Sequence, residues 1–439
     1  MAALRHWTSK QAARPIDATV TLPGSKSYTN RALLVAALAN GQSTLREALF
    51  SDDTDAMVAC LRALGIGIDV DAAQRRFVVS GQGGRIPATD ATLFAGAAGT
   101  AARFLTALLP LGHGTYQLDG TARMRQRPMA PLLAALRSLG ADITCTERDD
   151  CLPVVVHASG FRGGSASITG NQSSQFFSAL LLPAPCTRDG VDLRVVGDLV
   201  SKPYIDLTID VMGSFGADVT NAHYRTLSVA GGQRYTARDY DIEPDASGAS
   251  YFFAAAAITG GRVRVQNLAA TSAQGDVAFV DVLEQMGCQV TRGSNFIEVR
   301  GPEHLRGIDV DMNGISDTVQ TLAAIAPFAS EPVIMRNISH IRLKETDRIA
   351  ALTAELVRLG ATVEENPDAL VVQPSNLHAA DIQTYDDHRM AMSFAVTGLK
   401  VPGLRIADPA CVTKTFPDFF KRFEAMVAGS IVPGATGSH

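Results

Sequence analysis

The chain has 439 residues and a formal net charge of −5 at pH 7, so it lacks the basic surplus that is typical of nucleic-acid-binding proteins. Hydrophobic residues make up 46% and charged residues 19%, which is a globular balance with material for two or three domains. Its apolar runs are too short to span a bilayer. We therefore expect neither a nucleic-acid partner nor a membrane partner.

The six cysteines are scattered, and none forms a Cys-x-x-Cys pair or a Cys/His spacing suited to zinc. Scattered thiols of this kind are typical of a reduced cytosolic protein. The first residues lack the charged-then-apolar pattern of a signal peptide. We expect a cytoplasmic location and no bound metal.

An apolar helical stretch that ends in glycine and leads into a short β-like run recurs along the chain. These glycines are Gly65, Gly140, Gly216, Gly287 and Gly360. Successive members are separated by 75, 76, 71 and 73 residues. A glycine just past a helix end adopts the left-handed conformation without steric cost, and five at a near-constant spacing indicate a repeated unit.

A second marker, a small polar cluster that begins an apolar helix, keeps the same phase. The clusters centre on Ser27, Thr100, Ser174, Ser247, Ser316 and His388, with gaps of 73, 74, 73, 69 and 72 residues. Gly67–Val70 with Arg76–Ser80, and Gln289–Arg292 with Phe296–Arg300, are predicted to form hairpins. The sixth unit would end with a helix near 419–426.

These patterns predict an α/β fold of six units of about 73 residues, each with the order βαβαββ. Usual domain sizes favour two domains of three units, one over 23–241 and one over 1–22 plus 242–430, with a tail over 431–439. The first helix of each unit presents free N–H groups and a positive dipole end. Several such ends around a cleft between the domains would bind a polyanion, although ordinary N-capping explains any single one.

In the first half, basic and hydroxyl side chains stand at these helix starts. Leu22–Arg31 (LPGSKSYTNR) lacks the Walker A spacing, so a phosphate loop and a capped surface turn both remain open. Gly96–Arg103 fits a ligand-binding helix start or tight helix packing, and Arg123–Pro128 could be a solvated basic loop. Asn171–Gln175 and Ser201–Tyr204 are acceptable caps that also supply donors suited to phosphate.

The second half adds acids to the same positions. Asp317 stands at a helix start, and Arg342–Arg348 alternates in charge, a pattern that is usually a solvated helix face. Asp386–Met392 follows a strand and opens an apolar helix, and Lys414–Asp418 closes the series. His388 taken alone is more often a capping residue than a catalytic one.

As a set, these motifs resemble those of the EPSP synthase family of enolpyruvyl transferases. The matching segments are Leu22–Ser27 (LPGSKS), Arg123–Pro128 (RMRQRP), Ser173–Gln175 (SSQ), Ser201–Tyr204 (SKPY), Lys344–Arg348 (KETDR), Asp387–Met392 (DHRMAM) and Lys414–Asp418 (KTFPD). They stand in the family's order over about residues 20–425. The family fold of two inverse α/β domains, each of three βαβαββ units closing over a cleft, agrees with the repeat.

The resemblance implies a role for each matching residue. Shikimate 3-phosphate would contact Lys26, Ser27, Arg31, Ser173, Ser174, Gln175, Ser201, Tyr204, Asp317, His340 and Lys344. Phosphoenolpyruvate would contact Lys26, Gly99, Arg123, Gln175, Arg348, Arg389 and Lys414. Asp317 would take the proton of the 5-hydroxyl, while Glu345 and Lys26 would handle protons at the enolpyruvyl methylene and the leaving phosphate.

The implied reaction moves the enolpyruvyl group of phosphoenolpyruvate onto shikimate 3-phosphate, a step of the shikimate pathway to aromatic amino acids. Two phosphates and two carboxylates in one cleft require several Arg and Lys side chains and helix N-termini. Addition and elimination through a tetrahedral intermediate require an acid and a base in the same pocket. The resemblance implies no cofactor, a monomer, and closure of the domains over small-molecule substrates.

Two segments depart from the family pattern. Where the family often has Asn-Ala-Gly-Thr-Ala-x-Arg-Pro, this chain has Ala97–Phe104 (AAGTAARF). Where many members have Asn four residues before the Lys of Lys-Glu-Thr, it has His340. Glyphosate would occupy the phosphoenolpyruvate site of this family, so we expect the chain to be a glyphosate target with altered sensitivity.

Three other functions fit parts of the pattern. An enzyme that transfers enolpyruvate to UDP-N-acetylglucosamine would need Lys-Asn in the first loop and a reactive loop cysteine, whereas Ser27 follows Lys26 here. A non-catalytic phosphosugar sensor would not need Asp317 and Glu345. A small-molecule kinase would need a Walker A loop or kinase motifs, which the sequence lacks.

Overall fold

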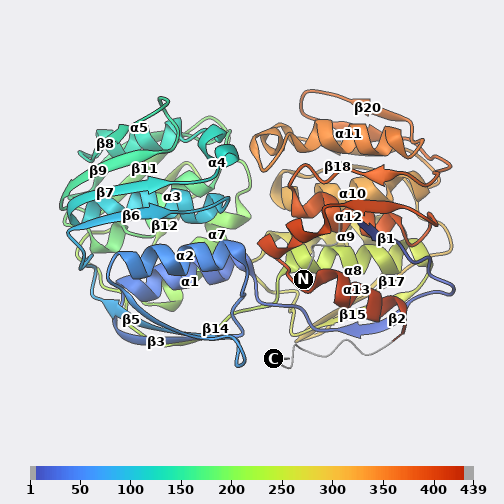
Figure 1. Ribbon diagram of the computed structural model, residues 1–439, viewed down its shortest axis with the longest axis horizontal. Coiled ribbons are helices and arrows are strands. Elements are labelled where there is room, and N and C mark those ends of the chain that lie inside the picture. The colour runs from blue at the N-terminus through green and yellow to red at the C-terminus, as the bar shows by residue number, and fades with distance from the viewer. Residues whose placement is uncertain (1–5, 430–439) are drawn as a thin grey trace. The chain divides into compact units, whose positions relative to one another are not determined.

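The computed structural model describes residues 6–429, which divide into two units (Figure 1). The N-unit comprises Gly24–Ile242. The C-unit comprises 6–23 together with 243–429, so the chain begins in the C-unit, leaves it and returns. The tail expected over 431–439 lies outside the described residues.

The N-unit contains three four-stranded sheets with one common topology. In sheet order they are β14 (Asp239–Asp241), β3 (Asn40–Arg46), β5 (Arg76–Gln82) and β4 (Gly67–Asp71); β6 (Asp90–Phe94), β7 (His113–Asp119), β9 (Val154–Ser159) and β8 (Asp142–Cys145); and β10 (Gly164–Thr169), β11 (Val191–Val196), β13 (Thr226–Val229) and β12 (Thr220–Ala222). In each sheet the first two strands are parallel and the remaining pairs are antiparallel.

The described part of the C-unit repeats this topology in two four-stranded sheets and one smaller sheet. In sheet order they are β2 (Asp17–Val20), β15 (Arg262–Gln266), β17 (Phe296–Arg300) and β16 (Gln289–Arg292); β18 (Ile308–Asp311), β19 (Val333–Arg336), β21 (Leu370–Val372) and β20 (Val363–Glu365); and β22 (Asp381–Ile382), β23 (Arg405–Ala407) and β1 (His6–Thr8). The α/β class with six repeated units, predicted from the sequence, is confirmed.

Strands distant in sequence complete three of these sheets. β2 precedes the first helix of the N-unit but pairs in parallel with β15 of the C-unit. β14, the last strand of the N-unit, takes the corresponding place beside β3. β1 pairs antiparallel with β23, where the other sheets have a hairpin strand. The two predicted hairpins are confirmed as β4 with β5 and β16 with β17.

Two kinds of helix follow the strands in each unit of the repeat. The first kind is buried and consists of α1 (Lys26–Leu38), α3 (Gly99–Leu108), α6 (Gln175–Leu181), α8 (Ala246–Thr259), α10 (Val319–Ile325) and α12 (His388–Thr397). The second kind consists of α2 (Asp52–Ala63), α5 (Ala130–Ser138), α7 (Pro203–Ser214), α9 (Phe279–Gln285), α11 (Arg348–Arg358) and α13 (Phe419–Val427), with a short α4 (Ala122–Gln126) before α5. Helices of the first kind are buried on almost all sides because they lie inside the unit, and polar residues such as Asn30 and Arg31 of α1 are buried with them.

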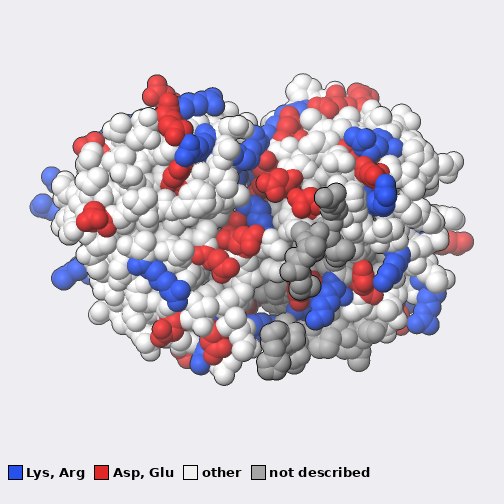
Figure 2. All heavy atoms as spheres, in the orientation of Figure 1, with Lys and Arg blue, Asp and Glu red and all other residues white. Residues whose placement is uncertain are grey.

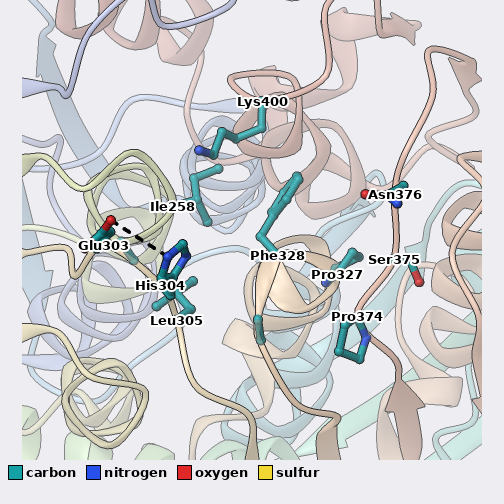
Figure 3. A pocket seen from close by; sticks show the side chains of 12 residues that line it. Ile258, Glu303, His304, Leu305, Pro327, Phe328, Pro374, Ser375, Asn376 and Lys400 are labelled. Atoms are coloured by element: carbon teal, nitrogen blue, oxygen red, sulfur yellow. Dashed lines mark ion pairs between the residues drawn. The ribbon is translucent and has the colours of Figure 1, made fainter.

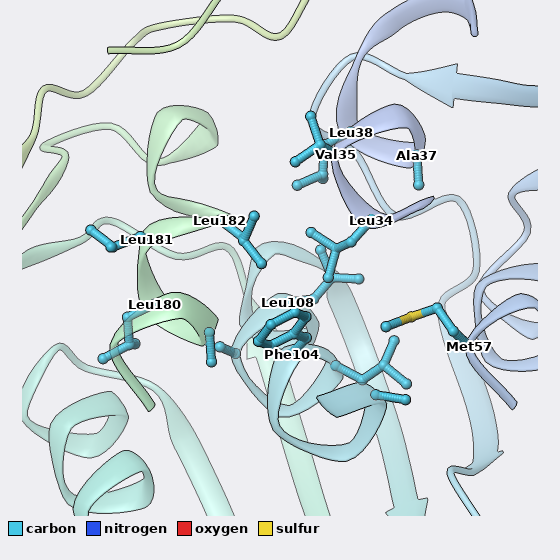
Figure 4. Packing of buried hydrophobic residues seen from close by; sticks show 14 of the residues in the cluster. Leu34, Val35, Ala37, Leu38, Met57, Phe104, Leu108, Leu180, Leu181 and Leu182 are labelled. Atoms are coloured by element: carbon cyan, nitrogen blue, oxygen red, sulfur yellow. The ribbon is translucent and has the colours of Figure 1, made fainter. Parts of the chain in front are cut away.

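The core of the N-unit forms where its three buried helices meet. Leu34 of α1, Phe104 and Leu108 of α3, and Leu182 directly after α6 lie close to one another (Figure 4). The C-unit has its own core around the corresponding helices α8, α10 and α12. Each core fixes the N-termini of its buried helices, and Lys26, Gln175 and Arg389 are among the predicted site residues that stand at those ends.

The five repeat glycines adopt the conformation that their spacing predicts. The φ angles are +86° at Gly65, +90° at Gly140, +86° at Gly216, +104° at Gly287 and +94° at Gly360. Each follows a helix of the second kind, and a side chain there would be strained. Among the described residues, none of the helices combines the length and apolarity needed to cross a membrane. Acidic and basic side chains are interspersed on the face of the protein shown in Figure 2.

Candidate active site

Lys26 is the first residue of α1, where Ser25 caps the helix by accepting a hydrogen bond from the Tyr28 amide. Its ammonium lies 3.2 Å from the carboxylate of Asp53, which is buried in the first turn of α2. The Lys26 side chain is 14% exposed. An ammonium held in place and still accessible can contact an anionic ligand.

Arg31 is buried, one turn deeper than Ser27 on α1. Its guanidinium donates to the Thr208 hydroxyl at 2.8 Å and to the carbonyl oxygens of Ser27 at 3.1 Å and Tyr204 at 3.2 Å. Its Cζ lies 5.2 Å from the ring centroid of Phe104. Burial lowers the pKa of Arg31 to about 10. Arg31 thus ties α1 to α7, and its contact with the substrate carboxylate stays a prediction.

Gln175, the first residue of α6, is held by α3. Its side-chain oxygen accepts from Arg103 at 2.5 Å, and its side-chain nitrogen donates to Thr100 at 3.4 Å. The Arg103 guanidinium also lies over the Phe176 ring, 5.1 Å from the centroid. The sequence placed Arg103 in a candidate segment but did not assign it to the site. Its partner could have been found only from the packing of α3 on α6.

Gly99 begins α3 against the buried side chain of Arg127. A Cβ atom at residue 99 would lie 2.4 Å from Nη1 of Arg127, far inside van der Waals contact. Close approach, rather than an unusual φ, therefore requires glycine at this position. The sequence did not assign Arg127 to the site, although it belongs to the predicted segment Arg123–Pro128.

The arginines of that segment have different environments. Arg123 and Arg125 lie in the short helix α4, where the sequence left a solvated loop open. Arg125 is held by Asp119 at 2.5 Å and by Glu147 at 2.8 Å. Arg123 is exposed, and within α4 its guanidinium donates to the Gln126 side chain at 3.4 Å. Arg123 therefore remains the arginine of this segment best suited to reach a ligand.

The serines assigned to phosphate lie at the starts of α6 and α7, two helices that pack together. Ser174 and Ser201 are buried, while Ser173 is half-buried and accepts from the Gln175 amide at 3.3 Å. Ser201 has a φ of +53°, so the turn that presents it is sterically constrained. Hydroxyls beside helix starts are suitable donors to phosphate.

In the C-unit, three cations surround the carboxylate of Asp317. Lys344 lies 3.2 Å from Oδ1, Arg348 lies 3.2 Å from the same oxygen, and Arg389 lies 2.8 Å from Oδ2. Asp317 belongs to the 3-10 helix Asn313–Thr318, directly before α10. Cations from a loop, from α11 and from α12 therefore meet at one acid.

Arg348 bridges three carboxylates through its three nitrogens. Besides Asp317 at Nη1, it donates from Nη2 to Glu345 at 2.8 Å and from Nε to Asp387 at 2.8 Å. Its side chain is 1% exposed, and that of Asp387 is fully buried. Only a planar guanidinium has donors in the fixed fork that this arrangement needs. The run Arg342–Arg348 is therefore not a solvated helix face, because Arg348 and part of the run turn inward.

Arg389 is oriented by its own helix start. Asp387 caps α12 and accepts from the Arg389 amide at 2.9 Å, while the guanidinium of Arg389 contacts the Tyr251 hydroxyl at 3.3 Å. Burial raises the pKa of Tyr251 to about 12, so this hydroxyl stays protonated at neutral pH. Lys414 is also buried, at the end of the 3-10 helix Pro409–Lys414.

Two further groups of the C-unit have strongly shifted pKa values. Burial is the main cause, and the positive charge of Lys344 the second, that lowers the pKa of His340 to about 3, so its imidazole is neutral. Burial is the main cause, and the negative charge of Asp317 the second, that raises the pKa of Asp276 to about 6. Asp276 accepts a hydrogen bond from Ser247, which stands at the start of α8. The sequence singled out the Ser247 cluster but not Asp276, which carries no motif of its own.

The predicted residues can be sorted by unit. The N-unit group comprises Lys26, Arg123, the Gly99 backbone and the hydroxyls at the starts of α6 and α7. In the C-unit group, ion pairs join Asp317 and Glu345 to Arg348, and Asp317 also to Arg389. A separate cavity of about 430 Å³ in the C-unit is lined by Phe328 and Lys400, among others, and contains none of the predicted residues (Figure 3). We therefore do not place the reaction there.

Comparisons with known proteins identify the family. The family model described as EPSP synthase (3-phosphoshikimate 1-carboxyvinyltransferase) matches residues 10–423. A relative from Trichormus variabilis, named 3-phosphoshikimate 1-carboxyvinyltransferase, is 55% identical over 414 residues, which is 94% of this chain and 97% of the relative. A relative of the same name from Yersinia pseudotuberculosis is 48% identical over 411 residues, covering 93% of this chain and 96% of the relative.

A solved structure of an EPSP synthase from Acinetobacter baumannii superimposes with a TM-score of 0.81, covering 98% of this chain and 99% of that one. At 24% sequence identity, this likeness shows the fold alone. The family model and the more similar relatives confirm the resemblance that the motifs indicated. The chain belongs to the EPSP synthase family.

Proposed function

We propose that the protein transfers the enolpyruvyl group of phosphoenolpyruvate to the 5-hydroxyl of shikimate 3-phosphate, with release of phosphate. The observation that carries this proposal is the cluster at Asp317, where one carboxylate meets Lys344, Arg348 and Arg389. The relatives at 48–55% identity are named for this reaction. The protein is accordingly a transferase that acts on small molecules.

The N-unit group would bind shikimate 3-phosphate. Ser173, Ser174 and Ser201 would donate to its phosphate, and Ser27 with Arg31 would serve its carboxylate. Because Arg31 is buried and bonded to α7, its part would be to present a fixed positive charge beneath Ser27. Gln175 and Tyr204 would lie near the ring. A fixed set of donors orients the substrate before the reaction begins.

The cationic groups would bind phosphoenolpyruvate. The predicted ligands are Lys26, Gly99, Arg123, Gln175, Arg348, Arg389 and Lys414. Two of them, Arg348 and Arg389, now contact carboxylates at 2.8 Å. An incoming phosphate and carboxylate would share these donors, because a guanidinium can bind two anions along different edges. His340, Lys344 and Asp317 would complete the shikimate 3-phosphate ligands.

The acids would carry the proton transfers. A proton from Glu345 or Lys26 would reach the methylene carbon of phosphoenolpyruvate, and the 5-oxygen would attack the adjacent carbon while Asp317 takes its proton. The tetrahedral intermediate would then lose phosphate, and the methyl group would return one proton to restore the enol double bond. The predicted groups are divided between the two units, so turnover would require groups from both.

Phosphate release tests the proposal directly. It should require both shikimate 3-phosphate and phosphoenolpyruvate, and Asp317→Asn should lower turnover by about 10²–10⁴-fold. Asp309→Asn is the matched control, because Asp309 is an exposed aspartate on β18 whose partner is Arg336. Release from either substrate alone, or equal effects of the two variants, would contradict the proposal.

The cytoplasmic location, the monomeric state and the lack of a nucleic-acid partner also remain proposals. They rest on the composition and on the family resemblance. Fractionation of the source cells and light scattering of the purified chain would test the location and the monomer. A nucleic-acid affinity that falls steeply with salt would contradict the third.

A further inference from the structure

The turn before α12 has an unusual backbone. Tyr385 and Asp386 are consecutive, neither is glycine, and their φ angles are +55° and +56°. Two successive L-residues in the left-handed region are sterically costly and persist only where surrounding contacts hold them. The next residue, Asp387, caps α12 and binds Arg348. The constrained turn therefore stands directly beside the predicted phosphoenolpyruvate group.

A buried carboxylate on α11 holds this turn. Glu355 has no exposed side-chain area. Its Oε1 accepts from the Tyr385 hydroxyl at 2.7 Å, and its Oε2 accepts from the Gln383 amide at 3.0 Å. A third partner, Arg358, donates to Glu355 at 3.0 Å and also interacts with the Tyr385 hydroxyl, but its side chain is 47% exposed. The first two bonds tie the turn to α11 at two points.

The same helix binds the turn again, two turns toward its N-terminus. Arg348 begins α11, and its guanidinium meets Asp387 at 2.8 Å. Residues 348 and 355 are seven apart, so they share one helix face. Tyr385 and Asp387 are thus both anchored to α11, one by Glu355 and one by Arg348. This pair of anchors sets the start of α12 and with it Arg389, whose guanidinium lies 2.8 Å from Asp317.

We propose that Glu355 is a positioning residue, whose bond to the Tyr385 hydroxyl holds the turn so that Asp387 and Arg389 keep their places around Arg348 and Asp317. This proposal rests on the proposed function for its kinetic consequence. Glu355 bonds to the turn and to Arg358, and it acts on the ligands only through the turn. Partial burial and the bond to Glu355 raise the pKa of Tyr385 to about 12, so the hydroxyl remains a donor throughout the working pH range.

Kinetics of the full chain test the proposal. Tyr385→Phe keeps the ring and removes only the donor, so it should raise KM for phosphoenolpyruvate by about tenfold and change KM for shikimate 3-phosphate by less than about twofold. Arg336→Ala is the control, because it removes an exposed arginine that pairs with Asp309 elsewhere in the C-unit and should leave both values unchanged. Glu355→Gln should fall between wild type and Tyr385→Phe, since its amide oxygen can accept from Gln383 while its nitrogen donates to the Tyr385 oxygen.

A second measurement does not depend on activity. Amide hydrogen exchange at Gln383 and Arg389, whose N–H groups donate to Glu355 and Asp387, should accelerate in Tyr385→Phe and stay unchanged in Arg336→Ala. Unchanged exchange, or equal rises in KM for both substrates, would overturn the positioning role. A wild-type chain that releases no phosphate with both substrates would refute the proposed function instead, and hydrogen exchange would still decide the role of Glu355.

Discussion

Replacing Arg348 by alanine should destabilise the C-unit far more than removal of an exposed arginine. Arg348 is 1% exposed and is the cation nearest to the buried carboxylate of Asp387. In its absence Asp387 would retain the Arg389 amide at 2.9 Å and the Gln320 side chain at 3.4 Å, both of them neutral donors. A buried charge that loses its charged partner costs about 3–5 kcal/mol.

That cost corresponds to a large thermal shift. For domains of 150–250 residues, 1 kcal/mol lowers the melting temperature by about 2–4 °C, so Arg348→Ala should lower the C-unit transition by roughly 6–20 °C. Differential scanning calorimetry of the full chain measures it, because the N-unit transition serves as an internal reference. The heating rate should be varied to separate equilibrium from irreversible unfolding.

Arg405→Ala is the matched control. Arg405 forms a bidentate pair with Asp381 in the same unit, with both bonds at 2.5 Å, but the two side chains are 51% and 41% exposed. Exposed pairs contribute about 0–1 kcal/mol, so its shift should stay below about 4 °C. A shift for Arg348→Ala no larger than that of Arg405→Ala would refute the reasoning from burial.

Three further predictions concern the site. Gly99→Ala should raise KM for phosphoenolpyruvate by about tenfold, because the new methyl group would displace Arg127; steady-state kinetics measure it, and an unchanged KM would contradict it. The pKa of His340 is about 6.5 in the unfolded chain and about 3 in the folded protein. The folded state therefore loses stability as the pH falls below 6.5, because the unfolded state binds a proton that the folded state does not. The free energy of unfolding should fall by about 1.4 kcal/mol for each pH unit in that range. His340→Asn should therefore lose less stability than wild type between pH 7 and 5 in urea titrations, and parallel losses would argue against a neutral imidazole. Ala97→Asn should change the glyphosate inhibition constant, and the idea fails if wild type already matches a relative with Asn there.

The repeat could be predicted from the sequence because its signals are local. A glycine after a helix indicates that the backbone at that residue has a positive φ, as at Gly65 and Gly360. A hairpin likewise joins segments that are neighbours in the sequence. The helix starts were equally visible, since small polar residues before apolar runs indicate an N-terminus. The motifs then resembled one family as an ordered set, which the comparisons confirmed.

The environment of individual side chains could not be predicted in the same way. Arg31 and Thr208 are 177 residues apart in the chain, and only the packing of α1 on α7 brings them together. Asp276 and Glu355 carry no motif, because burial rather than sequence context gives each its role. In the segment Arg123–Pro128, the pattern could not tell the exposed Arg123 from Arg125, which pairs with Asp119, or from the buried Arg127.

The distance in sequence between β2 and its partner β15 affects how the chain is assembled. Ribosomes release β2 long before β15, and the bond between Asp17 and Arg262 joins residues 245 positions apart. Throughout that interval β2 has no sheet to join, whereas the N-unit sheets are complete once β14 has been synthesised. The Asp245 amide donates to the Pro23 carbonyl at 3.0 Å, so the residues on either side of the N-unit segment meet within the C-unit. The N-unit can thus be regarded as a domain inserted into one loop of its host, and it can finish folding during synthesis while the host remains incomplete.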